Sequence, residues 1–281
     1  MLKQRIITAL LMLAVLIPAV LYPDTRVFGL ITTLLMAAAM WEWSRLNGQS
    51  QAVSWFLGFF LAAICALFWW QGGIAIAHNG LWLKVGAVWV LMGAWLLHGG
   101  VAAWQRLHLA FRMPLGFFAL WAAWLAVNQA RALGINFLFS VMVLVWVADS
   151  AAYFAGRSLG GKFFARKLAP SISPGKTWEG VCGGMVGVLV LAFVWRYADG
   201  YWLVEQPSIY THLAKQGLLL MVVGVVFLAA MSVVGDLVES LFKRSAGVKD
   251  SSALLPGHGG VLDRVDALLP TLPLAMMLLS V

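Results

Sequence analysis

Charged residues are scarce in this 281-residue chain: Asp, Glu, Lys and Arg make up 11% of it, whereas soluble domains contain about 25%. Hydrophobic residues make up 62%, which excludes an ordinary water-soluble globular domain. The only two cysteines, Cys65 and Cys182, lie in apolar segments and have no partner at disulfide or metal-ligand spacing. The sequence therefore predicts an all-α polytopic integral membrane protein without disulfide or cysteine chemistry.

A helix needs about 20 mostly apolar residues to cross a bilayer. The N-terminal apolar run follows Lys3 and Arg5, as in a signal sequence, but no small-residue cleavage site follows it, which indicates an uncleaved first helix. The apolar segments predict nine spans: 6–22, 27–44, 53–71, 81–98, 114–131, 136–156, 178–197, 217–242 and 265–281.

Basic residues are distributed unevenly between these spans. With the N-terminus in the cytoplasm, 14 of the 19 Lys and Arg residues lie on the cytoplasmic side, as the positive-inside rule requires. The net charge of +8 is thereby explained without a nucleic-acid partner. Nine spans would place the C-terminus outside and the polar loops 157–177 and 243–264 in the cytoplasm. We expect a multi-pass protein of the cytoplasmic (inner) membrane whose active site faces the cytoplasm.

The polar motifs are confined to the second half of the chain, and no internal repeat is apparent. Residues 1–131 are predicted to be transmembrane scaffold helices and residues 132–281 a catalytic transmembrane region, the two forming one structural unit. The last four spans would enclose a cytoplasm-facing polar cavity. Transporters more often show broken helices in two similar halves, so this asymmetry favours an enzyme.

The densest polar segment is 240–266, which lies between two apolar stretches where charge is costly. Asp263 and Asp266 are three residues apart and would share a helical face if a helix begins near Gly260. Two such carboxylates suit a hard cation such as Mg²⁺. A solvated basic loop explains the cations of this segment but not the paired aspartates. The positive side chains available to neutralise phosphate are Lys243, Arg244, Lys249 and Arg264.

Glycines in the same segment favour anion binding. Gly257, Gly259 and Gly260 would allow backbone N–H groups to turn toward a phosphate. His258 would either contact phosphate or order the Gly259-Gly260 turn, and the sequence does not decide between these roles.

A second polar constellation runs from residue 149 to residue 180. Asp149, Tyr153 and Arg157 recur at helical spacing, so they would lie along one face of the sixth span. Asp149 would then face a polar cavity or a cation, or pair with Arg157 or a backbone donor. In 173–180, Ser173 or Thr177 would cap the seventh span and leave Lys176 near a phosphate-attracting helix start. A P-loop is excluded, because Pro170 stands where its first glycine is required.

Two further acidic positions are notable. Asp236 and Glu239 precede Lys243 and Arg244 at helical spacing, so Asp236 would either join the metal site or pair with one of these cations. Glu42, which lies between two tryptophans and is followed by Arg45, is predicted to form an interfacial ion pair, with contact to the cavity as the alternative.

The C-terminal segment resembles the signature of the CDP-diacylglycerol synthase (phosphatidate cytidylyltransferase) family, S-x-φ-K-R-x4-K-D-x-small-x2-φ-P-x-H-G-G-φ-x-D-R-φ-D, where φ is apolar. The strings D-x-x-A-Y-x-x-G-R and S-P-x-K-T-x-E-G, which begin at Asp149 and Ser173, are similar to the same family. The residues that match the C-terminal signature are Ser240, Lys243, Arg244, Lys249, Asp250, Ser252, Leu255, Pro256, His258, Gly259, Gly260, Asp263, Arg264 and Asp266.

This resemblance implies the reaction CTP + phosphatidate → CDP-diacylglycerol + pyrophosphate. From the residues themselves we expect Mg²⁺ at Asp263 and Asp266, joined by Asp236, to assist it. It also implies a second, monovalent cation such as K⁺ and a homodimer in the lipid bilayer. A related CTP-dependent lipid kinase and an anionic-solute transporter are the alternatives. The residues expected to act in catalysis are Asp236, Lys243, Arg244, Asp263 and Asp266. Those expected to bind substrate are Asp149, Tyr153, Arg157, Ser173, Lys176, Lys249, His258, Gly259, Gly260 and Arg264.

Overall fold

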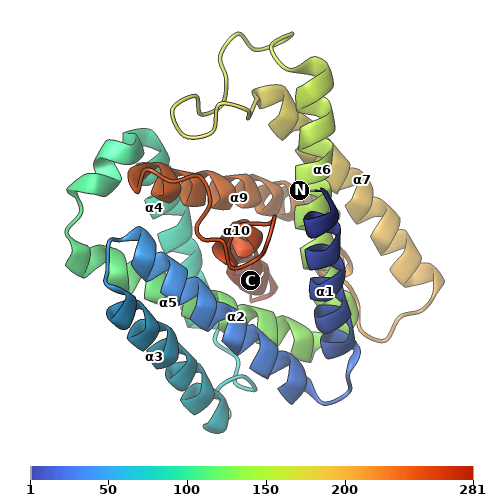
Figure 1. The fold of residues 1–281 in the computed structure, drawn as a ribbon. Coiled ribbons are helices and arrows are strands. Elements are labelled where there is room, and N and C mark those ends of the chain that lie inside the picture. Colours follow the sequence, from blue (N-terminus) through green and yellow to red (C-terminus); the bar gives the residue numbers. More distant parts are fainter. Residues whose placement is uncertain (1, 281) are drawn as a thin grey trace.

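The computed structural model describes residues 2–280 as a bundle of helices (Figure 1). Eight of the helices in this range are long and apolar enough to cross a membrane, namely α1 to α7 and α9. This confirms the prediction of an all-α polytopic membrane protein. The helices are α1 (Leu2–Leu21), α2 (Thr25–Leu46), α3 (Gln51–Trp70), α4 (Asn79–Arg106), α5 (Leu109–Leu133), α6 (Ile135–Leu159), α7 (Trp178–Tyr201), α8 (Ile209–Gln216), α9 (Leu218–Ser245), α10 (Leu262–Val265) and α11 (Leu268–Leu279).

The predicted ninth span, 265–281, is not among the eight candidate spans of the described residues. Its apolar residues form most of α11, a helix of 12 residues. At about 1.5 Å per residue this helix is roughly 18 Å long, too short for a hydrocarbon core of about 30 Å. The predicted outside location of the C-terminus depended on this span and loses its support. Helix α8, which has eight residues, was not predicted.

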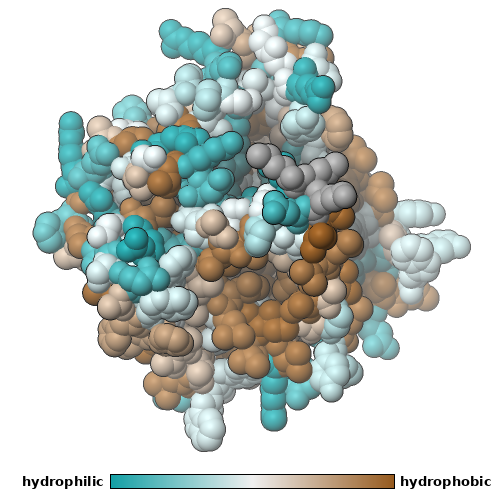
Figure 2. All heavy atoms as spheres, in the orientation of Figure 1, coloured by the Kyte–Doolittle hydropathy of each residue, from teal (hydrophilic) through white to brown (hydrophobic). Residues whose placement is uncertain are grey.

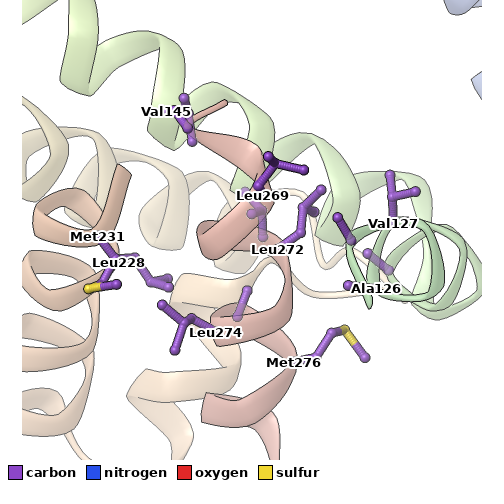
Figure 3. Packing of buried hydrophobic residues seen from close by; sticks show 14 of the residues in the cluster. Ala126, Val127, Val145, Leu228, Met231, Leu269, Leu272, Leu274 and Met276 are labelled. Atoms are coloured by element: carbon purple, nitrogen blue, oxygen red, sulfur yellow. The ribbon is translucent and has the colours of Figure 1, made fainter. Parts of the chain in front are cut away.

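Helix α11 lies at the centre of the bundle, where it contacts α4, α5 and α9. Figure 3 shows its side chains among those of the surrounding helices: Leu272 and Leu274 lie near Leu228 of α9 and Ala126 of α5. Val145 of α6 belongs to the same buried cluster. Because α11 is enclosed by protein, its apolar residues form the core of the bundle rather than a lipid-facing surface.

The most extensive contact between two helices is that of α6 with α7. Glycines of α7 face alanines of α6 here, and a Cβ added at Gly184 would lie only 2.8 Å from the carbonyl oxygen of Ala148. In a membrane, close packing of small residues is a main source of helix association. This packing fixes the polar end of α6 against the start of α7.

Two irregular loops lie at one end of the bundle. Residues 160–177 join α6 to α7, and residues 246–261 join α9 to α10. Arg244 at the end of α9 connects them, since its Nε donates to the carbonyl oxygen of Ile172 over 3.3 Å. Figure 2 shows hydrophilic residues over the upper part of the molecule, where the first loop lies, and mostly hydrophobic residues below. We call this the loop end of the bundle.

Candidate active site

A cleft of about 350 Å³ opens between α6, the start of α7 and α9. The sequence-predicted residues Asp149, Tyr153 and Arg157 of α6 line it together with Lys176 and Asp236. Lys176 Nζ and an Asp236 carboxylate oxygen are 2.6 Å apart. The structure therefore brings the second constellation and the end of α9 to one cleft.

Lys176 is placed by the start of α7. The Thr177 hydroxyl accepts a hydrogen bond from the Gly180 N–H at 3.1 Å, which is the cap geometry of a helix N-terminus. This confirms Thr177 as one of the two predicted caps. Ser173 shapes the preceding turn, because its carbonyl oxygen accepts from the Lys176 N–H at 3.2 Å. A positively charged side chain thus stands beside a helix N-terminus, an arrangement suited to anions.

The sequence allowed Asp149 to pair with Arg157, and Asp236 with Lys243 or Arg244, but the structure contains neither kind of ion pair among the described residues. Arg157 donates to the Tyr153 hydroxyl at 3.0 Å and forms no ion pair with Asp149 among the described residues. Asp236 pairs with Lys176 rather than with either cation that follows it on α9. Asp236 is thereby directed to the cleft.

Lys243 lies between two carboxylates. Its Nζ is 2.5 Å from Glu239 and 2.6 Å from Asp263. The contact with Glu239 is an ion pair rather than an aligned hydrogen bond, since neither Glu239 oxygen has a partner of hydrogen-bond geometry within residues 4–280. All three side chains are largely buried, so Lys243 does not face solvent. Its charge links Glu239 of α9 to Asp263 of α10.

Asp263 is held by four donors. Lys243 Nζ donates to one oxygen, and the Ser251 hydroxyl and the backbone N–H groups of Ser251 and Gly260 donate to the other at 2.7–2.9 Å. Burial raises the pKa of the Asp263 carboxyl, but the hydrogen bonds from Lys243, Gly260 and Ser251 outweigh burial and hold that pKa below its usual range. The Gly260 N–H, expected to face an anion, binds this carboxylate instead.

Asp266 follows α10 and lies against α9. A Cβ added at Gly235 would lie 2.6 Å from the Asp266 carbonyl oxygen, so the glycine permits this close approach of the two backbones. The Asp266 carboxylate accepts from the Ala267 N–H at 2.7 Å. Burial and the negative charge of nearby Asp236 together raise the pKa of Asp266 to about 7. The two carboxylates repel each other, and a cation between them would remove that repulsion.

The carboxylate oxygens of Asp236 and Asp266 are suitable ligands for a divalent metal. Asp236 and Asp266 offer hard oxygen ligands, and Mg²⁺ in phosphate-binding sites commonly takes one or two carboxylates and completes its shell with water and substrate oxygens. Within residues 4–280, no group of three or more His, Cys, Asp or Glu side chains is arranged as a complete metal site. The predicted set of three aspartates stays a prediction, with Asp263 committed to Lys243 and the loop.

The remaining predicted residues surround this region. Arg244 holds the loops together, its Nη1 donating to the Val248 carbonyl oxygen at 3.1 Å. Lys249 and Arg264 are exposed and so are available to an anionic ligand. His258 is partly buried, and its Nδ1 has no hydrogen-bond partner within residues 4–280. Gly259, with φ at +82°, forms the turn beside it.

The sequence-based interpretation of Glu42 was wrong. This side chain of α2 is fully buried. It accepts hydrogen bonds from three donors of the 251–262 segment and lies within hydrogen-bond distance of a fourth, the Ser251 hydroxyl. Arg45, its expected partner, donates instead to the Gln49 carbonyl oxygen at 2.7 Å. Helix α1 supports the same segment, since the Thr8 hydroxyl donates to the Pro256 carbonyl oxygen at 2.8 Å.

These features define an integral membrane protein with a phosphate-suited site at one end of its helix bundle. The model of the cytidylyltransferase family matches residues 3–281. The chain therefore belongs to the cytidylyltransferase family, a family of nucleotidyltransferases.

Curated relatives agree with this assignment. The chain is 36% identical to the phosphatidate cytidylyltransferase of Pseudomonas aeruginosa over 99% of its own length and 97% of that protein. It is 35% identical to the phosphatidate cytidylyltransferase of Haemophilus influenzae over 97% and 96% of the two chains. The enzyme of the same name from Bacillus subtilis is 45% identical over 52% of this chain and 48% of that protein.

Proposed function

We propose that this protein is a phosphatidate cytidylyltransferase, which converts CTP and phosphatidate to CDP-diacylglycerol and pyrophosphate in phospholipid synthesis. The relatives named above support the substrates, because two of them match this chain over nearly their whole length. The observation that carries the proposal is the Lys176–Asp236 contact of 2.6 Å. It joins Lys176, in one of the strings that resemble this family, to Asp236 of α9 at a single cleft, which therefore holds both charges that phosphate and metal require.

The chemistry would be in-line attack by a phosphatidate phosphate oxygen on the α-phosphorus of CTP. A new P–O bond forms to the α-phosphorus, the α–β bridging bond breaks, and pyrophosphate leaves with its electron pair. The nucleophile is already an anion, so no serine or cysteine nucleophile is required. The protein must instead orient two polyanions and offset their repulsion.

The contacts of each cation suggest how that work is divided. Lys176 borders the cleft, and Lys249 and Arg264 are exposed, so we infer that these three contact phosphate groups. Lys243 and Arg244 already bind protein acceptors. We infer that these two hold the site in shape and add positive potential.

Asp236 and Asp266 are the proposed carboxylate ligands of Mg²⁺, and Asp263 is the third candidate because one of its oxygens accepts only from Lys243. When bound, Mg²⁺ would neutralise charge on the phosphate oxygens and on the departing pyrophosphate. Asp149 lies near enough to Asp236 for their charges to interact, so it adds negative potential on the side of the cleft formed by α6.

We also propose that the loop end faces the cytoplasm of a bacterial inner membrane and that the protein acts as a homodimer. The orientation is supported by the excess of Lys and Arg in segments that lie on one side of the predicted spans. The homodimer rests on the family resemblance of the sequence motifs alone.

The decisive experiment is a membrane assay with CTP labelled at the α-phosphate, unlabelled phosphatidate and Mg²⁺. We expect label in a chloroform-extractable product, in an amount that depends on phosphatidate. Label that enters lipid only from the γ-phosphate of CTP would instead identify a lipid kinase. If neither α-labelled nor γ-labelled CTP labels lipid, and an anion is taken up into vesicles, the transporter would be favoured.

Removing the lysine of the cleft tests its assigned role. Lys176→Ala is expected to lower kcat/KM for CTP about 10- to 100-fold, because a charge-assisted hydrogen bond to phosphate contributes roughly 1.5–3 kcal/mol. The Mg²⁺ concentration that gives half-maximal activity should not rise, because losing the lysine that pairs with Asp236 leaves that carboxylate free for the metal. Lys162→Ala is the matched control, since Lys162 is an exposed lysine of the same loop. Equal kcat/KM for Lys176→Ala and wild type would remove Lys176 from the substrate contacts.

A further inference from the structure

Glu42 of α2 is a fully buried carboxylate that belongs to the N-terminal half of the chain. One of its oxygens accepts from the Ser252 hydroxyl at 2.5 Å and from the Val261 N–H at 2.9 Å. The other accepts from the Leu262 N–H at 2.7 Å and lies 3.2 Å from the Ser251 hydroxyl, whose single proton it shares with Asp263. Three donors of its own, and a fourth that it shares with Asp263, satisfy a buried group that would be costly without partners.

Glu42 and Asp263 both bind the loop that precedes α10. The Ser251 hydroxyl lies within hydrogen-bond distance of both carboxylates, at 3.2 Å from Glu42 and 2.8 Å from Asp263. A Cβ added at Gly260 would collide with the Ser251 hydroxyl and the Glu42 carboxylate. The segment is therefore folded around two carboxylates that come from α2 and α10.

The same contacts set the path of the chain into α10. Val261 and Leu262 donate their N–H groups to Glu42, and Leu262 is the first residue of α10. The next residue is Asp263, and Asp266 directly follows the helix. A side chain of α2 thus holds the start of the short helix that leads to Asp266.

From this geometry we propose that Glu42 is a positioning residue for cytidylyl transfer. It fixes the 251–262 segment so that His258 and Arg264 are presented to the substrate phosphates and Asp266 to the metal. This inference deepens the proposed function and rests on it. It also gives α2, which the sequence predicts to be a scaffold helix, a direct part in forming the site.

Two substitutions test whether the hydrogen bonds that Glu42 accepts are what the site needs, because one removes the side chain and the other keeps its size. Glu42→Ala removes all four acceptor contacts and is expected to lower kcat/KM about 10- to 100-fold, the range typical of residues that orient catalytic groups. Glu42→Gln keeps one oxygen for Val261 and Ser252, but its NH₂ group would face the Leu262 N–H. We expect this variant to recover part of the activity lost in Glu42→Ala.

Asp199 provides a matched control at the opposite end of α7. It is also buried, and it accepts hydrogen bonds from Asn136, from Thr211 and from the backbone and hydroxyl of Ser208. Asp199→Ala should cost comparable stability while leaving the KM for CTP and the kcat of the folded protein unchanged. Equal losses of kcat/KM in Asp199→Ala and Glu42→Ala would mean that Glu42 acts only through general stability, which overturns the proposal.

Hydrogen–deuterium exchange measures the positioning independently of activity. Glu42→Ala should increase exchange of backbone amides in 251–262 but not in 199–211, and Asp199→Ala should do the reverse. Unchanged exchange of 251–262 in Glu42→Ala would overturn the proposal even if wild type had no transferase activity. If exchange increases and wild type is active, unchanged kcat/KM in Glu42→Ala would also overturn it. Wild type that transfers no label refutes the proposed function instead.

Discussion

Replacing Asp266 by asparagine is expected to lower kcat/KM for cytidylyl transfer by about 10²- to 10³-fold while the protein stays folded. Asparagine has nearly the same shape and keeps an oxygen for the Ala267 N–H, which donates to Asp266 in the structure. What is lost is the negative charge beside Asp236. Preorganised charges and donors at the reacting groups of enzymes typically contribute rate factors of this size.

Steady-state kinetics in detergent or nanodiscs would test this expectation across a wide range of Mg²⁺ concentrations. Asp24→Asn is the control, because Asp24 caps α2 at its start, away from the cleft, and Asn caps helices about as well as Asp. A kcat/KM within about three-fold of wild type for Asp266→Asn would contradict the assignment of Asp266 to the metal. A loss that appears only as a lower yield of folded protein would contradict it too.

The membrane class and most helices follow directly from the sequence, because a bilayer selects long apolar segments. The error at 265–281 has a physical cause. Lipid and protein interior are both apolar, so a window of hydropathy cannot distinguish a spanning helix from a short one such as α11 that other helices surround. Pro270 and Pro273 lie within α11, but neither proline by itself marks the segment as a short helix.

The motifs of the site were predictable where the contacts are local. Asp149, Tyr153 and Arg157 lie on one helix, so helical periodicity alone placed them together at the cleft. Glu42 is different, because 209 residues separate it from Ser251, whose hydroxyl it binds. A single sequence gives no information on which distant segments meet. The one signal in the sequence was an acidic residue between two tryptophans in an apolar segment, and that signal fits an interfacial ion pair equally well.

Substituting Lys243 by methionine is expected to have the largest effect on stability. Lys243 is the only cation within ion-pair distance of Glu239 and Asp263 among the described residues. The side chains of these two acids are 5% and 4% exposed, so the variant would leave two buried carboxylates without a counterion. Removing one partner of a buried ion pair costs about 3–5 kcal/mol, which corresponds to a fall in Tm on the order of 10 °C. Thermal unfolding in detergent would measure this change.

A double substitution shows whether uncompensated charge is the cause. Glu239→Gln alone should change Tm little, because Lys243 retains Asp263 at 2.6 Å. Adding Glu239→Gln to Lys243→Met removes one of the two unpaired carboxylates, so the double variant should be more stable than Lys243→Met. Both Lys243→Met and the double variant should be inactive, since in each of them Asp263 lacks the lysine that connects the 251–262 segment to α9. If the double variant were less stable than Lys243→Met, the loss would arise from packing of the lysine side chain and not from its charge.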